Sequence, residues 1–199
     1  MMLDDAARRR HFEALYAHDE DPWQVRAAWY ERRKRAVLLA ALGRPSYRSA
    51  FEPGCGNGEL SASLAARCER LLACDGAAGA VAAARRRLQG DALAHGALRI
   101  EQRSLPAQWP RAERFDLVVV SELGYYFDAG AWRDLVAQAA SNLEEEGELL
   151  MCHYVHDFDD RAASTASVHA AADAIPALVR TVQHRDADFL LEVWTRRAA

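Results

Sequence analysis

Three glycines at alternate positions constrain the fold of this chain more than any other feature: Gly54, Gly56 and Gly58. The residues around them predict a short strand ending near Glu52, a glycine turn, a helix, and a second strand ending on Asp75. A glycine turn brings the backbone close to a ligand, because no Cβ stands in the way, and the helix behind it offers unpaired N–H groups. The stretch from Phe51 to Asp75 therefore predicts a βαβ unit.

The acid at the end of the second predicted strand indicates the kind of ligand. A carboxylate at this place, Asp75, accepts hydrogen bonds from ribose hydroxyls, so the unit predicts a nucleoside site. A dinucleotide fingerprint needs a third small residue where this chain has Glu59. That departure disfavours a nicotinamide oxidoreductase. The alternative to a ligand site is a glycine turn that only packs a helix closely on a sheet.

The G-x-G-x-G spacing, preceded by Glu52, resembles the first motif of Rossmann-like S-adenosylmethionine methyltransferases. The resemblance implies that Glu52 faces the ammonium group of the methionine end and that Asp75 faces the ribose. It implies S-adenosylmethionine as cofactor and S-adenosylhomocysteine as product. The three glycines then belong to the cofactor site.

The remaining pattern predicts an α/β fold. An apolar run over 115–120 is typical of a central parallel strand, and two strands over 179–184 and 189–196 predict an antiparallel hairpin. With the resemblance, this implies a seven-stranded Rossmann-like sheet with helices on both faces and an N-terminal helical cap. We expect one domain over 1–199, with the cap at 1–43 and the core at 44–199.

The N-terminal segment predicts a short helix over 11–16 and a long helix over 23–42, with Asp21 as N-cap. The D-P-W and W-Y-E-x-R-K elements of this segment resemble the nodulation protein S (NodS-like) group of methyltransferases. That resemblance implies that three side chains lie over the cofactor cleft, with the arginine near the methionine carboxylate: Trp23, Tyr30 and Arg33. The alternative is that Trp23 and Trp29 are core aromatics.

The third predicted strand ends before Ser104 and Leu105, where related methyltransferases often carry an aspartate against the adenine. Ser104 departs from that pattern. Its hydroxyl and the backbone N–H of Leu105 are the expected adenine contacts in this chain.

The fourth predicted strand opens into S-E-L-G-Y-Y, which again resembles the nodulation protein S group. Ligands collect at the carboxyl ends of strands in open α/β sheets, so the methyl acceptor is expected here, with Ser121 beside the cofactor. An amine acceptor must lose a proton, which requires a nearby base. The candidates are Glu122, which ranks first, Tyr126 and His153; the alternatives are a packed tyrosine and a structural histidine.

By resemblance, the expected function is N-methylation of a small amine or of a deacetylated amino sugar or oligosaccharide. Aromatic faces for a sugar are expected at Tyr125, Tyr126, Trp109 and Trp132. A small-molecule O-methyltransferase and a non-catalytic S-adenosylmethionine-binding regulatory module remain as alternatives, since a fold does not settle a substrate.

Composition argues against several other classes. The net charge of −4 gives no positive field for nucleic acid. No apolar run has the length of a membrane span and the first ten residues lack a secretory core, so we expect no membrane partner and a cytoplasmic location. The His153 to Asp160 cluster matches no standard metal spacing, so no metal is expected.

Overall fold

The structure is a computed structural model that describes residues 5–89 and 97–198. The chain divides into two compact units whose border lies between Ser104 and Leu105. We call them the amino-terminal unit and the carboxyl-terminal unit and describe each by itself. The first four residues of the predicted cap lie outside the described ranges.

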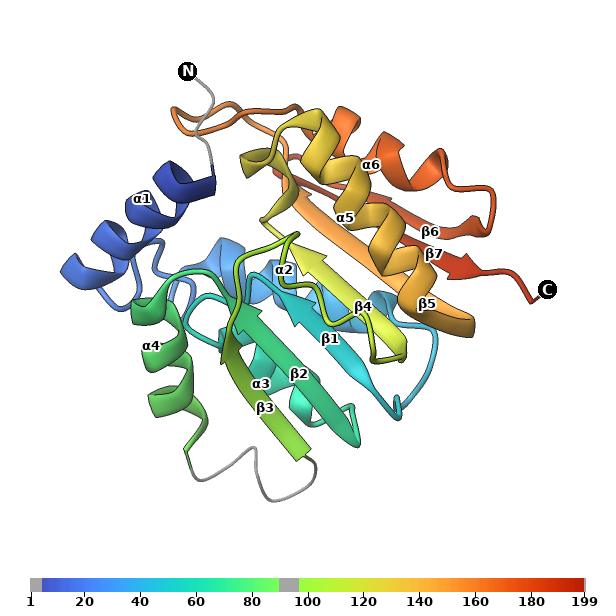
Figure 1. The fold of residues 1–199 in the computed structure, drawn as a ribbon, viewed down its shortest axis with the longest axis horizontal. Helices are drawn as coiled ribbons and strands as arrows, with labels where there is room; N and C mark the ends of the chain where they lie inside the picture. The colour runs from blue at the N-terminus through green and yellow to red at the C-terminus, as the bar shows by residue number, and fades with distance from the viewer. Residues whose placement is uncertain (1–4, 90–96, 199) are drawn as a thin grey trace. The chain divides into compact units, whose positions relative to one another are not determined.

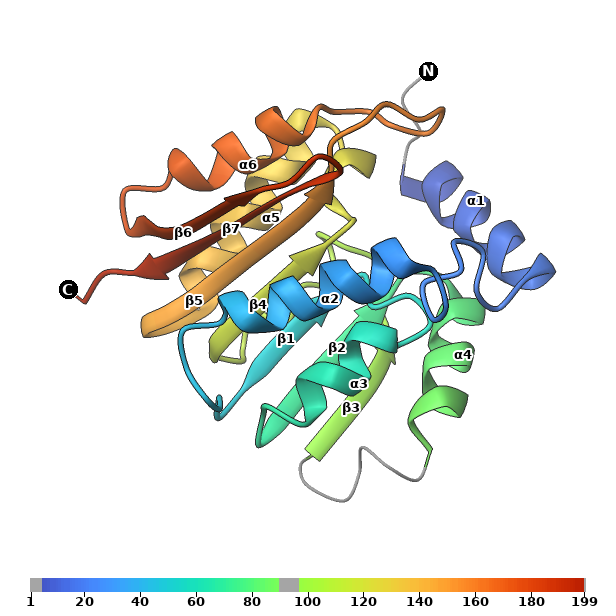
Figure 2. The same cartoon turned by 180° about the vertical axis from the view of Figure 1, so that it is seen from behind.

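The amino-terminal unit consists of a three-stranded parallel sheet and its helices. In Figure 2, α2 and α3 lie in front of the strands of this unit. Among its described residues, the α-helices are α1 Asp5–His18, α2 Trp29–Ala41, α3 Glu59–Ala65 and α4 Ala78–Leu88. Its strands are β1 Ala50–Pro53, β2 Arg70–Asp75 and β3 Ala97–Gln102.

Strand burial in this unit runs continuously instead of alternating. All four residues of β1 are buried, and so are the four between the first and last residues of β2. Continuous burial is typical of parallel strands covered on both faces. The carboxyl ends of β1 and β2 align through the pair Pro53 and Cys74, which places the glycine turn and Asp75 at one edge.

In the carboxyl-terminal unit, β4 and β5 pair in parallel and β7 pairs antiparallel with both β5 and β6. In Figure 1, α5 and α6 lie in front of the strands of this unit. Its strands are β4 Phe115–Ser121, β5 Leu143–Tyr154, β6 Leu178–Arg185 and β7 Phe189–Arg196. Its helical segments are the 3₁₀ turn η2 Gly124–Tyr126, α5 Ala129–Asn142 and α6 Thr165–Asp173.

The strand order is β3-β2-β1-β4-β5-β7-β6 in a seven-stranded sheet. The predicted α/β class is confirmed, and so is the antiparallel hairpin at the end of the chain. That hairpin places β7 beside β5, so one antiparallel strand interrupts an otherwise parallel arrangement.

The predicted start of the long helix is wrong. Helix α2 begins at Trp29, because Gln24 takes a left-handed φ of 53° that interrupts any helix from residue 23. The Asp21 carboxylate accepts hydrogen bonds from the backbone N–H groups of Val25 at 2.8 Å and Arg26 at 3.2 Å. Asp21 therefore stabilises an irregular turn instead of capping a helix.

The two tryptophans of this segment are not core residues. Trp23 is 44% exposed and Trp29 is 71% exposed, so the interpretation of both as core aromatics is wrong.

Candidate functional site

The glycine turn takes a conformation that other residues rarely adopt. Gly54, Gly56 and Gly58 have φ values of 74°, 54° and 82°. The N–H groups of Gly54 and Cys55 both donate to the Cys74 carbonyl, at 2.7 and 2.9 Å. These two bonds fix the turn against the last residues of β2. We call this turn, with Glu52 and Asp75, the glycine-turn site.

Asp75 is oriented by backbone donors. Its Oδ2 accepts from the N–H of Gly56 at 3.0 Å, and its Oδ1 accepts from the N–H of Ala77 at 2.9 Å. Burial raises the pKa of Asp75, although these N–H groups oppose the shift. Both carboxylate oxygens are therefore held in place at the carboxyl end of β2.

Glu52 is a buried acid, only 3% exposed. The Ser61 hydroxyl donates to its Oε2 at 2.6 Å. Burial raises the pKa of Glu52 to about 8, with a smaller contribution from the Asp75 charge and an opposing one from the Ser61 bond. Among the residues that the structure describes, no cationic side chain pairs with Glu52. The site thus contains a carboxyl group that a ligand cation would stabilise.

Helix α1 contributes two residues that the sequence did not indicate. Glu13 accepts from the N–H groups of Ala78, at 2.6 Å, and Gly79, at 3.3 Å, at the start of α4. A Cβ at Gly56 would lie 2.7 Å from the Tyr16 hydroxyl. Helix α1 therefore lies against both α4 and the glycine turn. The amphipathic pattern predicts a helix here but gives no partner for it.

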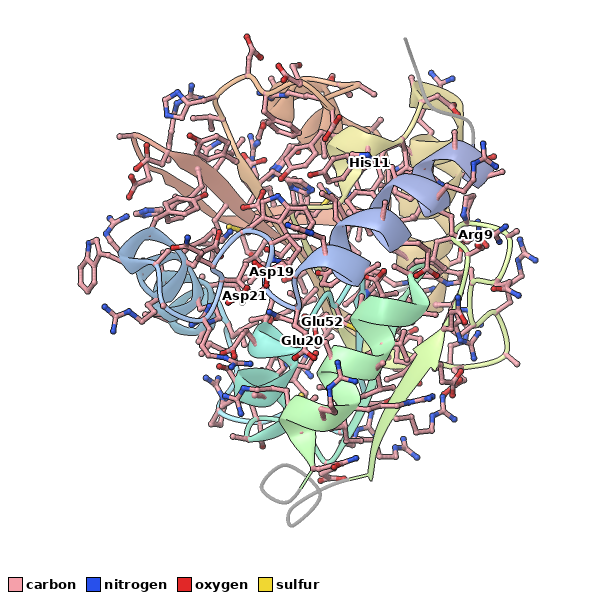
Figure 3. All side chains as sticks on the ribbon, turned by 90° about the vertical axis from the view of Figure 1, so that its left-hand side faces the viewer. Arg9, His11, Asp19, Glu20, Asp21 and Glu52 are labelled. Atoms are coloured by element: carbon pink, nitrogen blue, oxygen red, sulfur yellow. The ribbon has the colours of Figure 1, made fainter. Side chains whose placement is uncertain are left out.

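The segment after α1 is attached to the helix that follows the glycine turn; Figure 3 marks its acids Asp19, Glu20 and Asp21 together with Glu52. Asn57 donates to Asp21 Oδ1 at 2.9 Å. Glu59 pairs with Arg26 at 2.8 Å and with Arg87 at 2.9 Å. Burial opposes ionisation of Glu59, yet the bonds from Arg87 and Arg26 lower its pKa. This residue, which replaces the third glycine of a dinucleotide motif, is an ion-pair centre.

The other residues expected at the cofactor also lie in defined places. The Trp23 ring contacts the Tyr16 ring, with centroids 5.9 Å apart. Tyr30 and Arg33 lie in the first two turns of α2 and are half-buried, and Ser104 follows β3. In the carboxyl-terminal unit, Leu105 is buried and Ser121 is the last residue of β4. Their contact with a cofactor stays a prediction.

Glu122 follows β4 with a left-handed φ of 54°. For a residue with a long side chain this conformation costs about 1–3 kcal/mol, and such residues cluster at functional sites. Glu122 Oε2 accepts from the Tyr154 N–H at 3.0 Å and from the Tyr125 hydroxyl. We call Glu122, Tyr125 and Tyr126 the β4-end site.

The two tyrosines differ in their surroundings. Burial raises the pKa of Tyr126, and the charges of Glu122 and Asp160 add to the shift, so its phenol stays protonated at neutral pH. Tyr125 is buried and packs edge-on against Tyr126, with ring centroids 4.9 Å apart. Three of the four aromatics expected to face a sugar are buried, which contradicts that expectation: Tyr125, Trp109 and Trp132.

His153 is fully buried and both of its ring nitrogens are engaged. Its Nε2 accepts from the Gly124 N–H at 3.0 Å, and its Nδ1 lies 3.0 Å from Nε2 of His169. His169 was missed from the sequence, because nothing local places a residue of α6 against a residue of β5.

Over residues 5–89 and 97–198, no group of three or more His, Cys, Asp or Glu side chains is arranged to hold a metal ion. No helix in these ranges has the length and apolar character needed to span a bilayer.

Comparison with known proteins identifies the family. A family model described as a methyltransferase domain matches residues 50–147. A solved structure of a candidate methyltransferase from Pseudomonas syringae is 46% identical, with a TM-score of 0.73, over 85% of this chain and 100% of that chain. The N-methyltransferase NodS from Bradyrhizobium japonicum WM9, solved with S-adenosyl-L-homocysteine, is 25% identical, with a TM-score of 0.80, over 95% of this chain and 98% of that chain.

Nodulation protein S of Rhizobium tropici is 32% identical over 133 residues, which are 66% of this chain and 54% of the relative. The chain thus matches about half the length of the curated relatives. The span matched by the family model contains the glycine-turn site. The chain belongs to the S-adenosylmethionine-dependent methyltransferases and resembles nodulation protein S within that family.

Proposed function

We propose that this protein transfers a methyl group from S-adenosylmethionine to the nitrogen of a small amine or a deacetylated amino sugar. The observation that carries the proposal is the buried carboxyl of Glu52 beside a glycine turn whose N–H at Gly56 orients Asp75. The residues of the glycine-turn site fit the chemical groups of this cofactor one by one.

Glu52 fits the ammonium group of the methionine end. This buried acid has no cationic partner among the described residues, and the ammonium would supply the missing positive charge. Asp75 fits the ribose, since each of its oxygens keeps acceptor capacity beyond its backbone bond. When bound, S-adenosylmethionine supplies an electrophilic methyl group on a sulfonium. We propose that Trp23, Tyr30 and Arg33 also contact this cofactor, together with Ser104, Leu105 and Ser121.

Glu122 is the proposed base for the acceptor. Bonds from Tyr154 and Tyr125 fix its Oε2, and its strained backbone aims the side chain from the end of β4. A fixed carboxylate attracts a protonated amine and takes its proton. Tyr126 is proposed as a hydrogen-bond donor, because its raised pKa keeps the phenol protonated.

His153 has a different role in this proposal from the one expected from sequence. A base needs an unoccupied nitrogen within reach of the acceptor. Both nitrogens of His153 are engaged, with Gly124 and with His169, and the residue has no exposed surface. We therefore propose that His153 supports the turn after Glu122 and does not touch the acceptor.

Two observations favour nitrogen over oxygen as the methylated atom. The relative from Bradyrhizobium japonicum is described as an N-methyltransferase. In addition, the carboxylate of Glu122 suits a cationic amine, whereas a hydroxyl with a high pKa needs a stronger base.

The test is transfer of isotopically labelled methyl groups to matched acceptors. Deacetylated chitooligosaccharides and simple amines are compared with their N-acetylated forms and with hydroxyl-bearing metabolites. We expect label in the free amines and none in the N-acetylated forms. Label found only in hydroxyl compounds would replace the proposal with O-methylation. Cofactor binding without any transfer would support a regulatory module instead.

A further inference from the structure

Three buried side chains form a linear hydrogen-bonded chain inside the carboxyl-terminal unit. His153 Nδ1 lies 3.0 Å from His169 Nε2, and His169 Nδ1 lies 2.8 Å from Glu192 Oε2. His153, His169 and Glu192 are 0%, 2% and 1% exposed. They come from β5, α6 and β7, so the chain connects three elements. The far nitrogen of His153 accepts from the Gly124 N–H at 3.0 Å.

The backbone N–H of Gly124 determines which ring nitrogens of His153 and His169 carry protons. A backbone N–H only donates, so His153 Nε2 is unprotonated and the proton of His153 lies on Nδ1. That proton is donated to His169 Nε2, which leaves the His169 proton on Nδ1, facing Glu192. An imidazolium at His169 would require His153 to lose both protons. Both histidines are therefore neutral, with their protons on Nδ1.

At the other end, Glu192 fixes the direction in which these side chains donate their hydrogen bonds. Its Oε1 accepts from Arg180 Nη1 at 2.6 Å and from Gln183 Nε2 at 2.5 Å. Burial opposes ionisation of Glu192, but bonds from His169 and Gln183 and the charge of Arg180 lower its pKa. The group is thus an ionised carboxylate that accepts hydrogen bonds on both oxygens.

The hydrogen-bonded series of side chains ends at the Gly124 turn, which has little room to move. A Cβ at Gly124 would overlap Val168 Cγ1 and would lie 2.8 Å from the Trp132 ring. Val168 precedes His169 on α6, and Trp132 donates its Nε1–H to the Val168 carbonyl at 2.8 Å. Gly124 opens η2, two residues after Glu122 and two before Tyr126. A shift of Gly124 moves both groups of the proposed acceptor site.

We propose that Glu192 and His169 are positioning residues: through His153 they fix the Gly124 turn and hence the placement of Glu122 and Tyr126. The inference rests on the proposed function for its effect on turnover. Its structural part, the fixed proton positions and the bond to Gly124, stands independently of any acceptor. Buried polar chains whose members are all satisfied specify one arrangement strongly.

Glu192→Gln tests this with little change in shape. Arg180 and Gln183 both donate to the Oε1 position, so the amide oxygen is held there and the NH₂ group faces His169. His169 must then accept on Nδ1, and the protons of both histidines move to Nε2. Two donors, His153 Nε2–H and Gly124 N–H, then face each other and the bond to the turn is lost.

The protein offers a matched control variant and a second variant that should restore the bond to Gly124. Asp173→Asn changes an acid that also pairs with Arg180, at 3.3 Å, and accepts from the Trp194 indole at 2.9 Å, but is not one of the three hydrogen-bonded side chains. In the double variant Arg180→Met with Glu192→Gln, only Gln183 faces the Oε1 position. The Gln183 amide can flip and accept from the new NH₂ group, so the amide oxygen introduced by the substitution is free to turn toward His169. Arg180→Met alone serves as its reference.

The experiment combines ¹⁵N NMR of the histidine side chains, hydrogen exchange of the Gly124 amide, and kinetics. We expect Nδ1-protonated histidines and a protected Gly124 amide in the wild type and in Asp173→Asn. In Glu192→Gln we expect Nε2-protonated histidines, an unprotected Gly124 amide, and kcat lower by about tenfold with S-adenosylhomocysteine affinity unchanged, as for one lost buried hydrogen bond. The double variant should regain protection and part of kcat.

Nε2-protonated histidines in the wild type would overturn the inference, and so would a Gly124 amide that stays protected in Glu192→Gln. Altered proton positions with unchanged kcat in an active enzyme would overturn the positioning role alone. If the wild type methylates no acceptor, the proposed function fails, while the NMR and exchange results still decide the structural part.

Discussion

The Tyr125 hydroxyl donates a hydrogen bond to Oε2 of Glu122, the same oxygen that accepts from the Tyr154 N–H at 3.0 Å. This carboxylate follows β4 on a left-handed backbone, where the fold holds it at a conformational cost. Two donors therefore fix one oxygen of Glu122.

Glu122→Gln removes the proposed base and keeps an oxygen that can accept from Tyr154. We expect kcat to fall by about 10²-fold or more, the usual contribution of a general base, with cofactor affinity within a few-fold of the wild type. Tyr125→Phe, which removes only one donor, should have a smaller effect. Steady-state kinetics and calorimetry measure the two quantities. An equal loss of cofactor affinity would assign Glu122 to cofactor binding instead.

The raised pKa of Glu52 predicts how stability depends on pH. In the folded protein this pKa is about 8, against an ordinary value of 4.5, so folding favours the protonated acid. Its contribution to stability is complete below about pH 4.5 and declines as pH rises through 8. Glu52→Gln should flatten that decline in urea unfolding measured from pH 5 to 8.5. An equally steep decline in the variant would show that the raised pKa of Glu52 is not its cause.

Glu59 provides a control, because the fold shifts its pKa in the direction opposite to that of Glu52. Its pKa is lowered in the fold, because the bonds from Arg87 and Arg26 outweigh the effect of burial. Its contribution is therefore present above its ordinary pKa and lost as pH falls through the lowered value. Glu59→Gln should change stability at neutral pH and leave the decline between pH 5 and 8.5 intact.

Binding of a ligand ammonium should release a proton from Glu52. At pH 7 the acid is mostly protonated, and a nearby cation favours its charged form. Calorimetry of S-adenosylhomocysteine in buffers of different ionisation enthalpy should report release of close to one proton. Methylthioadenosine, which lacks the amino acid end, should release none, and Glu52→Gln should abolish the difference. Equal proton release by both ligands would contradict this role.

Gly58→Ala tests the glycine turn. The residue has φ of 82°, and a Cβ would lie 3.1 Å from Ala84 Cβ and 3.2 Å from Leu88 Cδ1. We expect a loss of about 1–3 kcal/mol in the free energy of unfolding, together with weaker cofactor binding. Gly76→Ala is the matched control, because its nearest neighbour would be at 3.8 Å and its φ is ordinary. Equal effects of both substitutions would mean that the turn conformation does not matter.

Asp21→Ala tests the attachment of the segment between α1 and α2. The change removes bonds to the N–H groups of Val25 and Arg26 and to the side chain of Asn57. We expect a loss of about 2 kcal/mol in urea unfolding and faster proteolysis near Gln24. Asp19→Ala, which removes the bond to the Asp21 N–H, should cost less. Unchanged proteolysis would show that other contacts hold the segment.

Local features of the fold could be predicted from the sequence because they depend on neighbouring residues. The left-handed turn follows from Gly54, Gly56 and Gly58, and the β4 strand follows from an apolar run. The start of α2 could not be predicted, since Asp21 and Pro22 suit a helix N-terminus equally well. In the competing turn at Gln24, Asp21 also accepts a hydrogen bond from Asn57, 36 positions away, which no local pattern reveals.

In the candidate site, too, some residues could be predicted from the sequence and others could not. Asp75 and Glu122 could be chosen because strand ends carry ligands in α/β sheets, and Glu52 because its motif resembles that of methyltransferases. Glu13 and Tyr16 could not, because a helical pattern does not name the surface that the helix covers. His169 and Glu192 gain their role only from packing across α6 and β7, where the sequence shows an isolated histidine and an acid in an apolar strand.

The most direct test of the central claim is titration calorimetry of the wild type and Asp75→Ala with S-adenosylhomocysteine. We expect micromolar or tighter binding by the wild type, weakened about tenfold or more in the variant, since Asp75 supplies charge-assisted acceptors for the ribose. No binding by the wild type at millimolar ligand, or binding that Asp75→Ala leaves unchanged, would contradict the assignment of this glycine turn to S-adenosylmethionine.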